Sequence, residues 1–157
     1  MRGNCPCARK EVEENGKKRM AEILTSYRVI YGDTDQMGVA YYANYLRWFE
    51  MGRTELLRQI GLPYTSVEEK GLRFPVIEVS CRYHKPARFD DLITIATALT
   101  SLGRASLTFS YRIFQHENDV LLATGWTKHA CVDREGQAIR IPESLEKTLK
   151  SALSNTD

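Results

Sequence analysis

Two aspartates, Asp33 and Asp35, stand just before a predicted helix, in the run Tyr31-Gly-Asp-Thr-Asp-Gln-Met-Gly-Val-Ala-Tyr-Tyr-Ala-Asn-Tyr45. A carboxylate is ionised at neutral pH, so it can attack a carbonyl carbon or take a proton from water. The first free N–H groups of the helix can bind a carbonyl oxygen on which negative charge develops. A base or nucleophile beside such an oxyanion site is the arrangement that acyl transfer requires.

The acidic pair also has structural interpretations. An aspartate just before a helix is most often an N-cap, and Asp-x-Asp occurs in divalent-metal sites, which need further oxygen ligands. We assign Asp33 to a cap or turn and Asp35 to the chemistry. Gly38 allows an unusual backbone path close to a ligand, with Val39 beside it. Spacing alone leaves capping and catalysis open.

The element that must position Asp35 is a long helix, predicted over residues 42–60. Apolar side chains recur along it at helical spacing, with charged residues between them. These apolar residues are Tyr42, Tyr45, Leu46, Phe49, Leu56, Leu57 and Ile60. Gly61 and Pro63 end the helix, and β-branched and aromatic residues predict a first strand over residues 25–31.

The rest of the chain predicts a sheet. Strands are expected over residues 74–83, 92–99, 106–114 and 120–132, with a short helix over 64–70 and a last helix over 142–153. Turn-rich links at 101–104, 116–119 and 134–136 indicate successive antiparallel hairpins. The predicted fold is α+β: a curved five-stranded antiparallel sheet wraps the long helix. Edge strands invite pairing with a second copy, so we expect at least a homodimer.

Composition indicates a single folded domain over residues 20–157. The net charge of +2, from 22 basic and 20 acidic residues, argues against a nucleic-acid partner, and no apolar run approaches the ~20 residues of a membrane span. Residues 1–19 are charged and predict a disordered extension, and a start at Met20 is a hypothesis that intact mass would test. Cys5 and Cys7 are too few ligands for a metal site, so no metal is expected, and a reducing cytoplasm fits the four cysteines.

The run from Tyr31 to Tyr45 resembles the signature of the 4-hydroxybenzoyl-CoA thioesterase family of hotdog-fold acyl-CoA thioesterases. The similarity continues through Arg53-Thr-Glu-Leu-Leu57, Tyr83-His-Lys-Pro-Ala-Arg-Phe-Asp-Asp-Leu92 and Ala123-Thr-Gly125, and covers roughly residues 25–142. It implies hydrolysis of an acyl-CoA to a free acid and CoA. It makes Asp35 the catalytic carboxylate and the backbone N–H at or near Tyr42 the group that polarises the thioester.

The resemblance also implies the substrate contacts. CoA is part of the substrate, so no separate cofactor is expected, and its phosphates call for basic residues near the tunnel mouth. The candidates are Arg88, Arg104 and Lys128, each equally plausible as a solvated charge. Phe74, Pro75 and Val76 are expected to line the acyl pocket from the neighbouring subunit, in a homodimer or dimer of dimers. His84 and His129 are expected at the surface or an interface.

One departure from the family concerns histidine. A large bacterial branch associated with the Tol–Pal envelope system carries a histidine just after the start of the helix, in a Val-Tyr-His pattern, where this chain reads Ala40-Tyr41-Tyr42. A shared catalytic histidine is therefore not expected, which also argues against an acyl-thioester hydratase or dehydratase. A non-catalytic protein that binds acyl carrier protein or envelope partners stays an alternative. The acyl group is not specified by the sequence.

Overall fold

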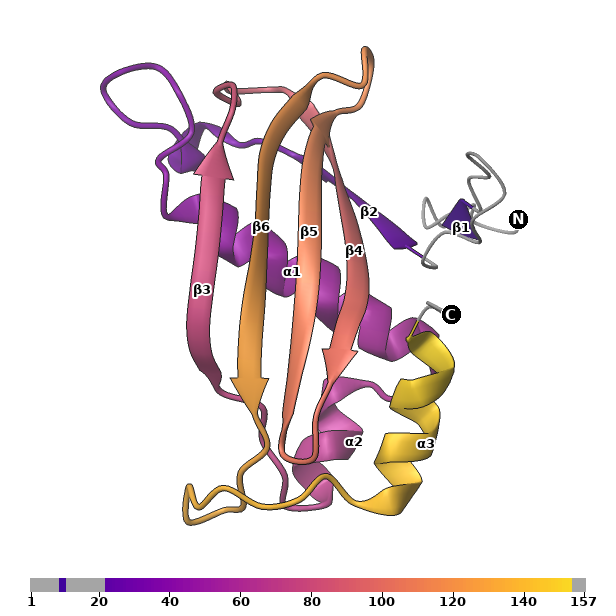
Figure 1. Cartoon of the computed structure of the whole chain (residues 1–157). Helices are drawn as coiled ribbons and strands as arrows, with labels where there is room; N and C mark the ends of the chain where they lie inside the picture. Colours follow the sequence, from indigo (N-terminus) through magenta and orange to yellow (C-terminus); the bar gives the residue numbers. More distant parts are fainter. Residues whose placement is uncertain (1–8, 11–21, 154–157) are drawn as a thin grey trace, which may run out of the picture.

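The computed structural model describes residues 9–10 and 22–153 of the 157-residue chain (Figure 1). Its strands are β1 (Arg9–Lys10), β2 (Glu22–Arg28), β3 (Val76–Tyr83), β4 (Leu92–Leu102), β5 (Ser106–Gln115) and β6 (Leu121–Ala130). Its helices are the 3-10 turn η1 (Tyr31–Asp33), α1 (Asn44–Gln59), α2 (Tyr64–Glu69) and α3 (Glu143–Ala152). Within these described ranges, no helix is long and apolar enough to cross a membrane.

The strands form one antiparallel sheet in the order β1-β2-β4-β5-β6-β3, which curves around α1 (Figure 1). The two-residue β1 extends a five-stranded sheet, so the predicted α+β architecture of a helix wrapped by a sheet is confirmed. The three main helices and the last four strands lie within three residues of their predicted bounds. The expected run of hairpins is only partly right. β4, β5 and β6 are joined by hairpins, whereas β3 pairs with β6, and the turn at 134–136 closes only the isolated bridge between Val132 and Ala138.

The first long strand is displaced from its predicted range of residues 25–31. It ends at Arg28, and Tyr31 opens the 3-10 turn instead. The cause is local: the Asp33 carboxylate accepts the Ile30 N–H at 3.0 Å, which bends the chain into a turn. The start of the strand lies earlier because Ile23 still pairs with Thr97 of β4.

The core forms where α1 lies against the sheet. The buried residues of α1 are Tyr45, Trp48, Phe49, Gly52, Leu56 and Leu57. The sequence pattern missed Trp48 and wrongly placed Leu46, which is 38% exposed. Gly52 is required by close packing, because a Cβ there would lie 2.2 Å from Thr97 Oγ1. Where α1 meets β5, the rings of Phe49 and Tyr111 stack with centroids 4.2 Å apart.

Strand β3 forms one edge of the sheet and leaves an apolar strip uncovered. Ile77, Val79 and Tyr83 are 57%, 44% and 45% exposed. Val79 lies opposite Thr127 of β6, which is buried on the face that α1 covers, so Val79 and Tyr83 lie on that same face, and Ile77 lies at the register shift between Val76 and Glu78. Edge strands with exposed apolar side chains are places where a second chain can pair.

The N-terminal extension expected over residues 1–19 falls almost wholly outside the described residues, as do Cys5 and Cys7. Arg9–Lys10 is the described part, and it pairs antiparallel with β2 through Arg9 and Ile23. The remaining cysteines, Cys81 and Cys131, are free thiols, and burial raises the pKa of each.

Candidate active site

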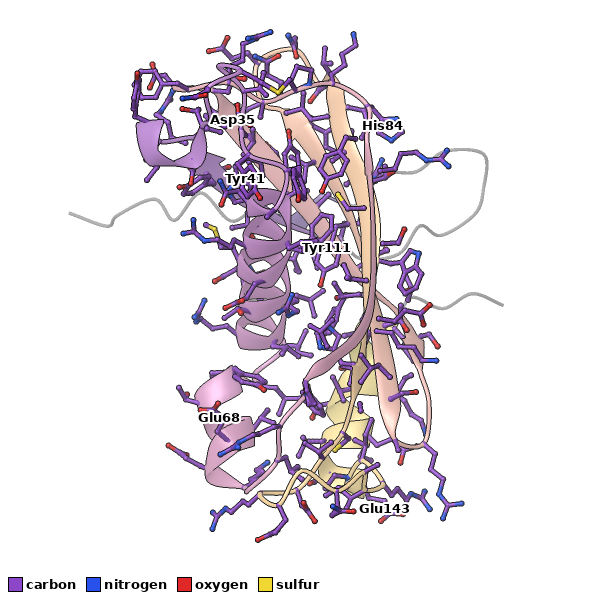
Figure 2. All side chains as sticks on the ribbon, turned by 90° about the vertical axis from the view of Figure 1, so that its left-hand side faces the viewer. Asp35, Tyr41, Glu68, His84, Tyr111 and Glu143 are labelled. Carbon is purple, nitrogen blue, oxygen red and sulfur yellow. The ribbon has the colours of Figure 1, made fainter. Side chains whose placement is uncertain are left out.

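Asp35 lies in a tight loop before α1 (Figure 2). Its N–H donates to the Val39 carbonyl at 3.0 Å, and its carbonyl accepts the Gly38 N–H at 3.0 Å. Its Oδ1 accepts the Met37 N–H at 2.8 Å, which fixes the rotamer of the carboxylate. Among the described residues, Oδ2 has no hydrogen-bond donor, and the side chain is half-buried. The loop depends on Gly38, whose φ of 75° is disfavoured for other residues.

Asp33 has the opposite environment, with only 1% of its surface exposed. Its Oδ2 accepts the Tyr27 hydroxyl at 2.7 Å as well as the Ile30 N–H, and Arg47 Nη1 lies 3.5 Å from Oδ1. Burial, followed by the hydrogen bond to Asp33, raises the pKa of Tyr27. Both oxygens therefore face protein groups, and Asp33 is not placed to reach a substrate.

Asp33 also connects the acidic loop to the helix through its carbonyl oxygen. That oxygen accepts the Tyr41 N–H and the Asn44 side-chain amide, both at 2.8 Å. The N-cap of α1 is Ala43, which has no capping side chain, so Asp33 closes the 3-10 turn and does not cap α1 itself. Asp33 therefore has the contacts of a turn residue, in the 3-10 turn that precedes the helix.

Helix α1 begins at Asn44, slightly later than predicted, and Tyr42 lies in the turn before it. The N–H of Asn44 donates to the Tyr41 carbonyl at 2.9 Å. In the described part of the chain, the N–H groups of Tyr42 and Ala43 have no acceptor. The Tyr83 hydroxyl donates to the Tyr42 carbonyl at 2.9 Å and fixes this peptide. The oxyanion donor expected at Tyr42 is thus available as a free N–H.

A hollow of about 250 Å³ opens beside Tyr42. It is lined by Val39, Ala40, Tyr42, Tyr45, Tyr83, His84, Lys85 and Pro86. Rings form much of its wall: the centroids of Tyr45 and Tyr83 are 4.9 Å apart, in an edge-to-face contact. Burial is the main cause of the raised pKa of Tyr83, which keeps its phenol protonated as a donor. The hollow therefore has largely aromatic walls beside the free N–H of Tyr42.

The other predicted contacts lie in different places. Arg88 Nη1 donates to the Gly38 carbonyl at 3.4 Å, so Arg88, Gly38 and Val39 gather at the loop of Asp35. Arg104 lies in the turn between β4 and β5, at the far end of the sheet. Lys128 lies opposite Glu78 and between the inward-facing Thr127 and His129, so its position faces away from α1.

Phe74 and Pro75 precede β3, at the end of that strand opposite Tyr83. Phe74 is buried and Pro75 is exposed. Within one chain they are therefore remote from the loop of Asp35.

His84 is exposed, as predicted, and its Nε2 lies 3.0 Å from Thr124 Oγ1. The prediction for His129 is wrong, because it is 1% exposed. Its Nδ1 lies 2.9 Å from the Phe74 carbonyl and its Nε2 lies 2.8 Å from Thr127 Oγ1. The ring is buried because β6 turns this side chain toward α1, a direction that alternation alone did not reveal.

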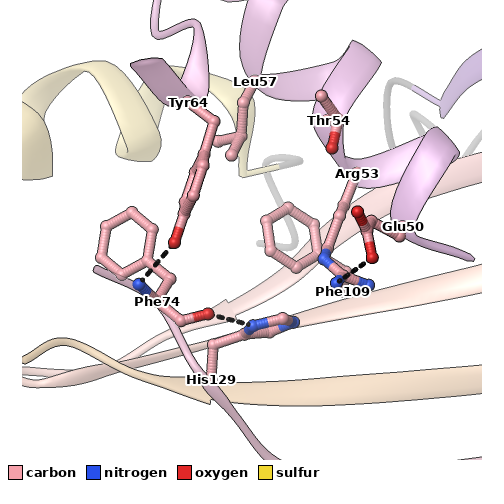
Figure 3. Close-up of a pocket in the computed structure, with 8 residues that line it drawn as sticks. All are labelled: Glu50, Arg53, Thr54, Leu57, Tyr64, Phe74, Phe109 and His129. Carbon is pink, nitrogen blue, oxygen red and sulfur yellow. Dashed lines mark hydrogen bonds and ion pairs between the residues drawn. The ribbon is translucent and has the colours of Figure 1, made fainter. Parts of the chain in front are cut away.

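A second cavity, of about 230 Å³, lies between α1, α2 and the sheet (Figure 3). It is lined by Glu50, Arg53, Thr54, Leu57, Tyr64, Phe74, Phe109 and His129. The sequence analysis did not identify this pocket, although Arg53 and Leu57 belong to a segment that it singled out. Its members come from five separate elements or links, so no contiguous motif indicates it. Among the described residues, no group of three or more possible metal ligands is present.

Comparison with known proteins agrees with this geometry. The profile of the thioesterase-like superfamily matches residues 29–149. The acyl-CoA thioester hydrolase YbgC of Escherichia coli O6:H1 is 39% identical over 94 residues, which are 60% of this chain and 70% of YbgC. The crystal structure of the hypothetical protein TT1821 from Thermus thermophilus is 38% identical, with a TM-score of 0.78, and the match covers 83% of this chain and 97% of that one.

A solved mutant of 4-hydroxybenzoyl CoA thioesterase, complexed with 4-hydroxybenzoyl CoA, shares the fold with a TM-score of 0.74. It is 22% identical, and the match covers 82% of this chain and 98% of that one. The fold and the site define a hotdog protein of the thioesterase type. The chain belongs to the thioesterase-like superfamily, and the predicted family resemblance is confirmed.

Proposed function

We propose that the protein hydrolyses acyl-CoA thioesters to a free acid and CoA. The observation that carries the proposal is the carboxylate of Asp35, whose Oδ2 is free of protein donors among the described residues, in the loop that leads to the free N–H of Tyr42. Val39 of this loop and Tyr42 both line an open hollow. Membership of the thioesterase-like superfamily and the name of the related YbgC support the same reaction. A carboxylate and an oxyanion donor are sufficient for thioester hydrolysis.

The Tyr42 N–H would bind the carbonyl oxygen as it becomes negative. Asp35 would either attack the carbonyl carbon through Oδ2 or take a proton from the water that attacks it. In both routes a C–O bond forms, the C–S bond breaks and CoA leaves as a thiolate that takes up a proton. Direct attack gives an anhydride of Asp35, which water then hydrolyses. Arg88, which donates to the Gly38 carbonyl, would contact the CoA phosphates.

The site would be shared between two copies of the chain. A twofold axis at the middle of β3 pairs its free edge with the same edge of the second copy, antiparallel. Val76 of one copy then lies near Tyr83 of the other, and the Phe74–Pro75 segment reaches the hollow beside Tyr42. This pairing also covers the apolar strip on β3, which supports a homodimer. A dimer of dimers, and a cytoplasmic location, stay predictions.

The test is a thiol-release screen with short, medium, long and aromatic acyl-CoAs and the matching acyl carrier protein thioesters, with mass measured by light scattering. We expect rapid release from at least one CoA ester and a mass of two chains or a multiple of two. Absence of release from every thioester, with tight binding of acyl carrier protein, would instead support the non-catalytic alternative. Hydration of an unsaturated acyl-CoA without thiol release would support the hydratase alternative, although this chain has no histidine in the loop of Asp35.

A further inference from the structure

Arg53 brings a permanent positive charge to the second cavity (Figure 3). Its side chain is only 18% exposed. Within the described residues, the one carboxylate inside 4.0 Å is that of Glu50, at 3.8 Å, too long for a hydrogen bond, and its side chain is 68% exposed. Guanidinium carries five N–H donors and does not lose its charge in proteins. Arg53 therefore keeps donor capacity toward the cavity.

Apart from the exposed Glu50, the polar groups of the pocket carry no charge that offsets that of Arg53. His129 donates from Nδ1 to the Phe74 carbonyl, so its Nε2 accepts from the Thr127 hydroxyl. The Thr127 oxygen in turn accepts the Tyr111 hydroxyl at 2.7 Å. Burial, and secondarily the charge of Arg53, lowers the pKa of His129 and keeps its ring neutral. His129 is thus neither a base nor a second cation, and Arg53 is the charged donor of this pocket.

The remaining walls are apolar and mostly aromatic, formed by Leu57, Tyr64, Phe74 and Phe109. An apolar cavity of about 150 Å³ binds benzene, and this cavity measures about 230 Å³. It therefore has room for one six-membered ring or a short chain with its terminal group. A flat or short acyl group fits the walls, and its far end then meets Arg53.

We propose that this pocket receives the far end of the acyl group and that Arg53 selects acyl groups ending in a carboxylate, carried on a ring or a short chain. A carboxylate offers two oxygens to the guanidinium, and the exposed Glu50 can turn to water and give up its place. The proposal rests on the proposed function, because the shared site brings the Phe74 end of one copy to the Asp35 loop of the other. It adds the substrate class: half-thioesters of dicarboxylic acids.

The experiment compares two CoA esters of matched shape, 4-carboxybenzoyl-CoA and 4-methylbenzoyl-CoA. In wild type, kcat/KM for the carboxylate is expected to be roughly 10- to 100-fold higher, the range of a charge-assisted hydrogen bond. Arg53→Met, of similar length and without charge, should abolish most of this ratio, while Arg53→Lys should keep part of it. Arg58→Met is the matched control, because Arg58 lies on the same helix outside the pocket and should leave the ratio unchanged.

Binding separates this proposal from the hydrolysis on which it rests. The dissociation constants of both esters are measured with Asp35→Asn and with Asp35→Asn/Arg53→Met, and free 4-carboxybenzamide and 4-methylbenzamide are tested as competitors. Tighter binding of both carboxylates that depends on Arg53 supports the pocket even if no ester is hydrolysed, an outcome that would refute only the proposed function. Hydrolysis without any preference for the carboxylate in wild type overturns the inference, whether or not Arg53→Met folds.

Discussion

The two ends of strand β3 border two different kinds of site. Near Tyr83, the loop of Asp35 and the turn at Tyr42 border an open hollow, and they carry a carboxylate and a free backbone N–H. Near Phe74, the pocket of Arg53 is walled by side chains from helices and strands. The first region holds its groups through main-chain hydrogen bonds over ten residues, from Asp33 to Tyr42, and the second through packing of distant segments.

This difference separates two tasks: the first region would carry out the reaction, and the second would select the acyl group. Main-chain donors exist whatever side chain occupies the position, so an oxyanion site at Tyr42 would serve any thioester. A pocket made of side chains changes with each substitution, so it can determine which acyl group is accepted. Antiparallel pairing of β3 edges would place one region of each copy beside the other region of its partner.

A large effect is expected from mixing two impaired variants. Asp35→Asn lacks the carboxylate and Arg53→Met lacks the selective cation. If the two regions come from different copies, each mixed dimer has one intact site. Statistical exchange of equal amounts should then give about a quarter of wild-type kcat/KM on 4-carboxybenzoyl-CoA. That is several times the activity of either variant alone, measured after refolding them together.

The control for this experiment is the same pair of variants assayed together without subunit exchange. Activity equal to the mean of the separate variants, before and after exchange, would contradict the shared site. It would place the Arg53 pocket and Asp35 of one chain in a single site. The two ends of β3 from different copies would then not form a shared site.

A smaller effect is expected at Asp33, and it falls on stability. Asp33→Asn weakens the charge-assisted bonds to Tyr27 and Ile30 in a buried position, so the free energy of unfolding should fall by about 1–3 kcal/mol. Chemical denaturation measures the change, with the exposed Asp119→Asn as control. Activity per folded molecule should stay within a few-fold of wild type, and a loss as large as that of Asp35→Asn would give Asp33 a direct part in the reaction.

The smallest effect concerns His129 in the second region. Burial lowers its pKa below the ordinary value of 6.5, so below about pH 6.5 the unfolded chain takes up a proton that the folded chain refuses. The free energy of unfolding should therefore decrease from pH 7.5 to 5.5, by at most about 1.4 kcal/mol per pH unit. Denaturation at several pH values measures the slope. His129→Gln should flatten it, and an equal slope in this variant would contradict the assignment.

The first region could be proposed from the sequence, whereas the second could not. The acidic run is contiguous, so Asp35, Gly38 and the donor at Tyr42 could be predicted from residues 31–45 and their resemblance to a family. The pocket of Arg53 depends on which way β6 turns His129 and on where α2 places Tyr64. Periodicity reports that residues alternate, but not which face the helix covers. Likewise, the sequence pattern did not reveal that the Asp33 carboxylate accepts the Ile30 N–H, which forms a turn before the predicted end of the first strand.

The most direct test of the central claim is the rate of the Asp35→Asn variant on whichever acyl-CoA the wild-type protein hydrolyses fastest. The exchange preserves shape and removes the charge, so stability should change little. We expect kcat to fall by roughly 10²- to 10⁴-fold, the contribution of a catalytic base or more. A folded Asp35→Asn protein that releases CoA at nearly the wild-type rate would contradict the assignment of Asp35 as the catalytic carboxylate.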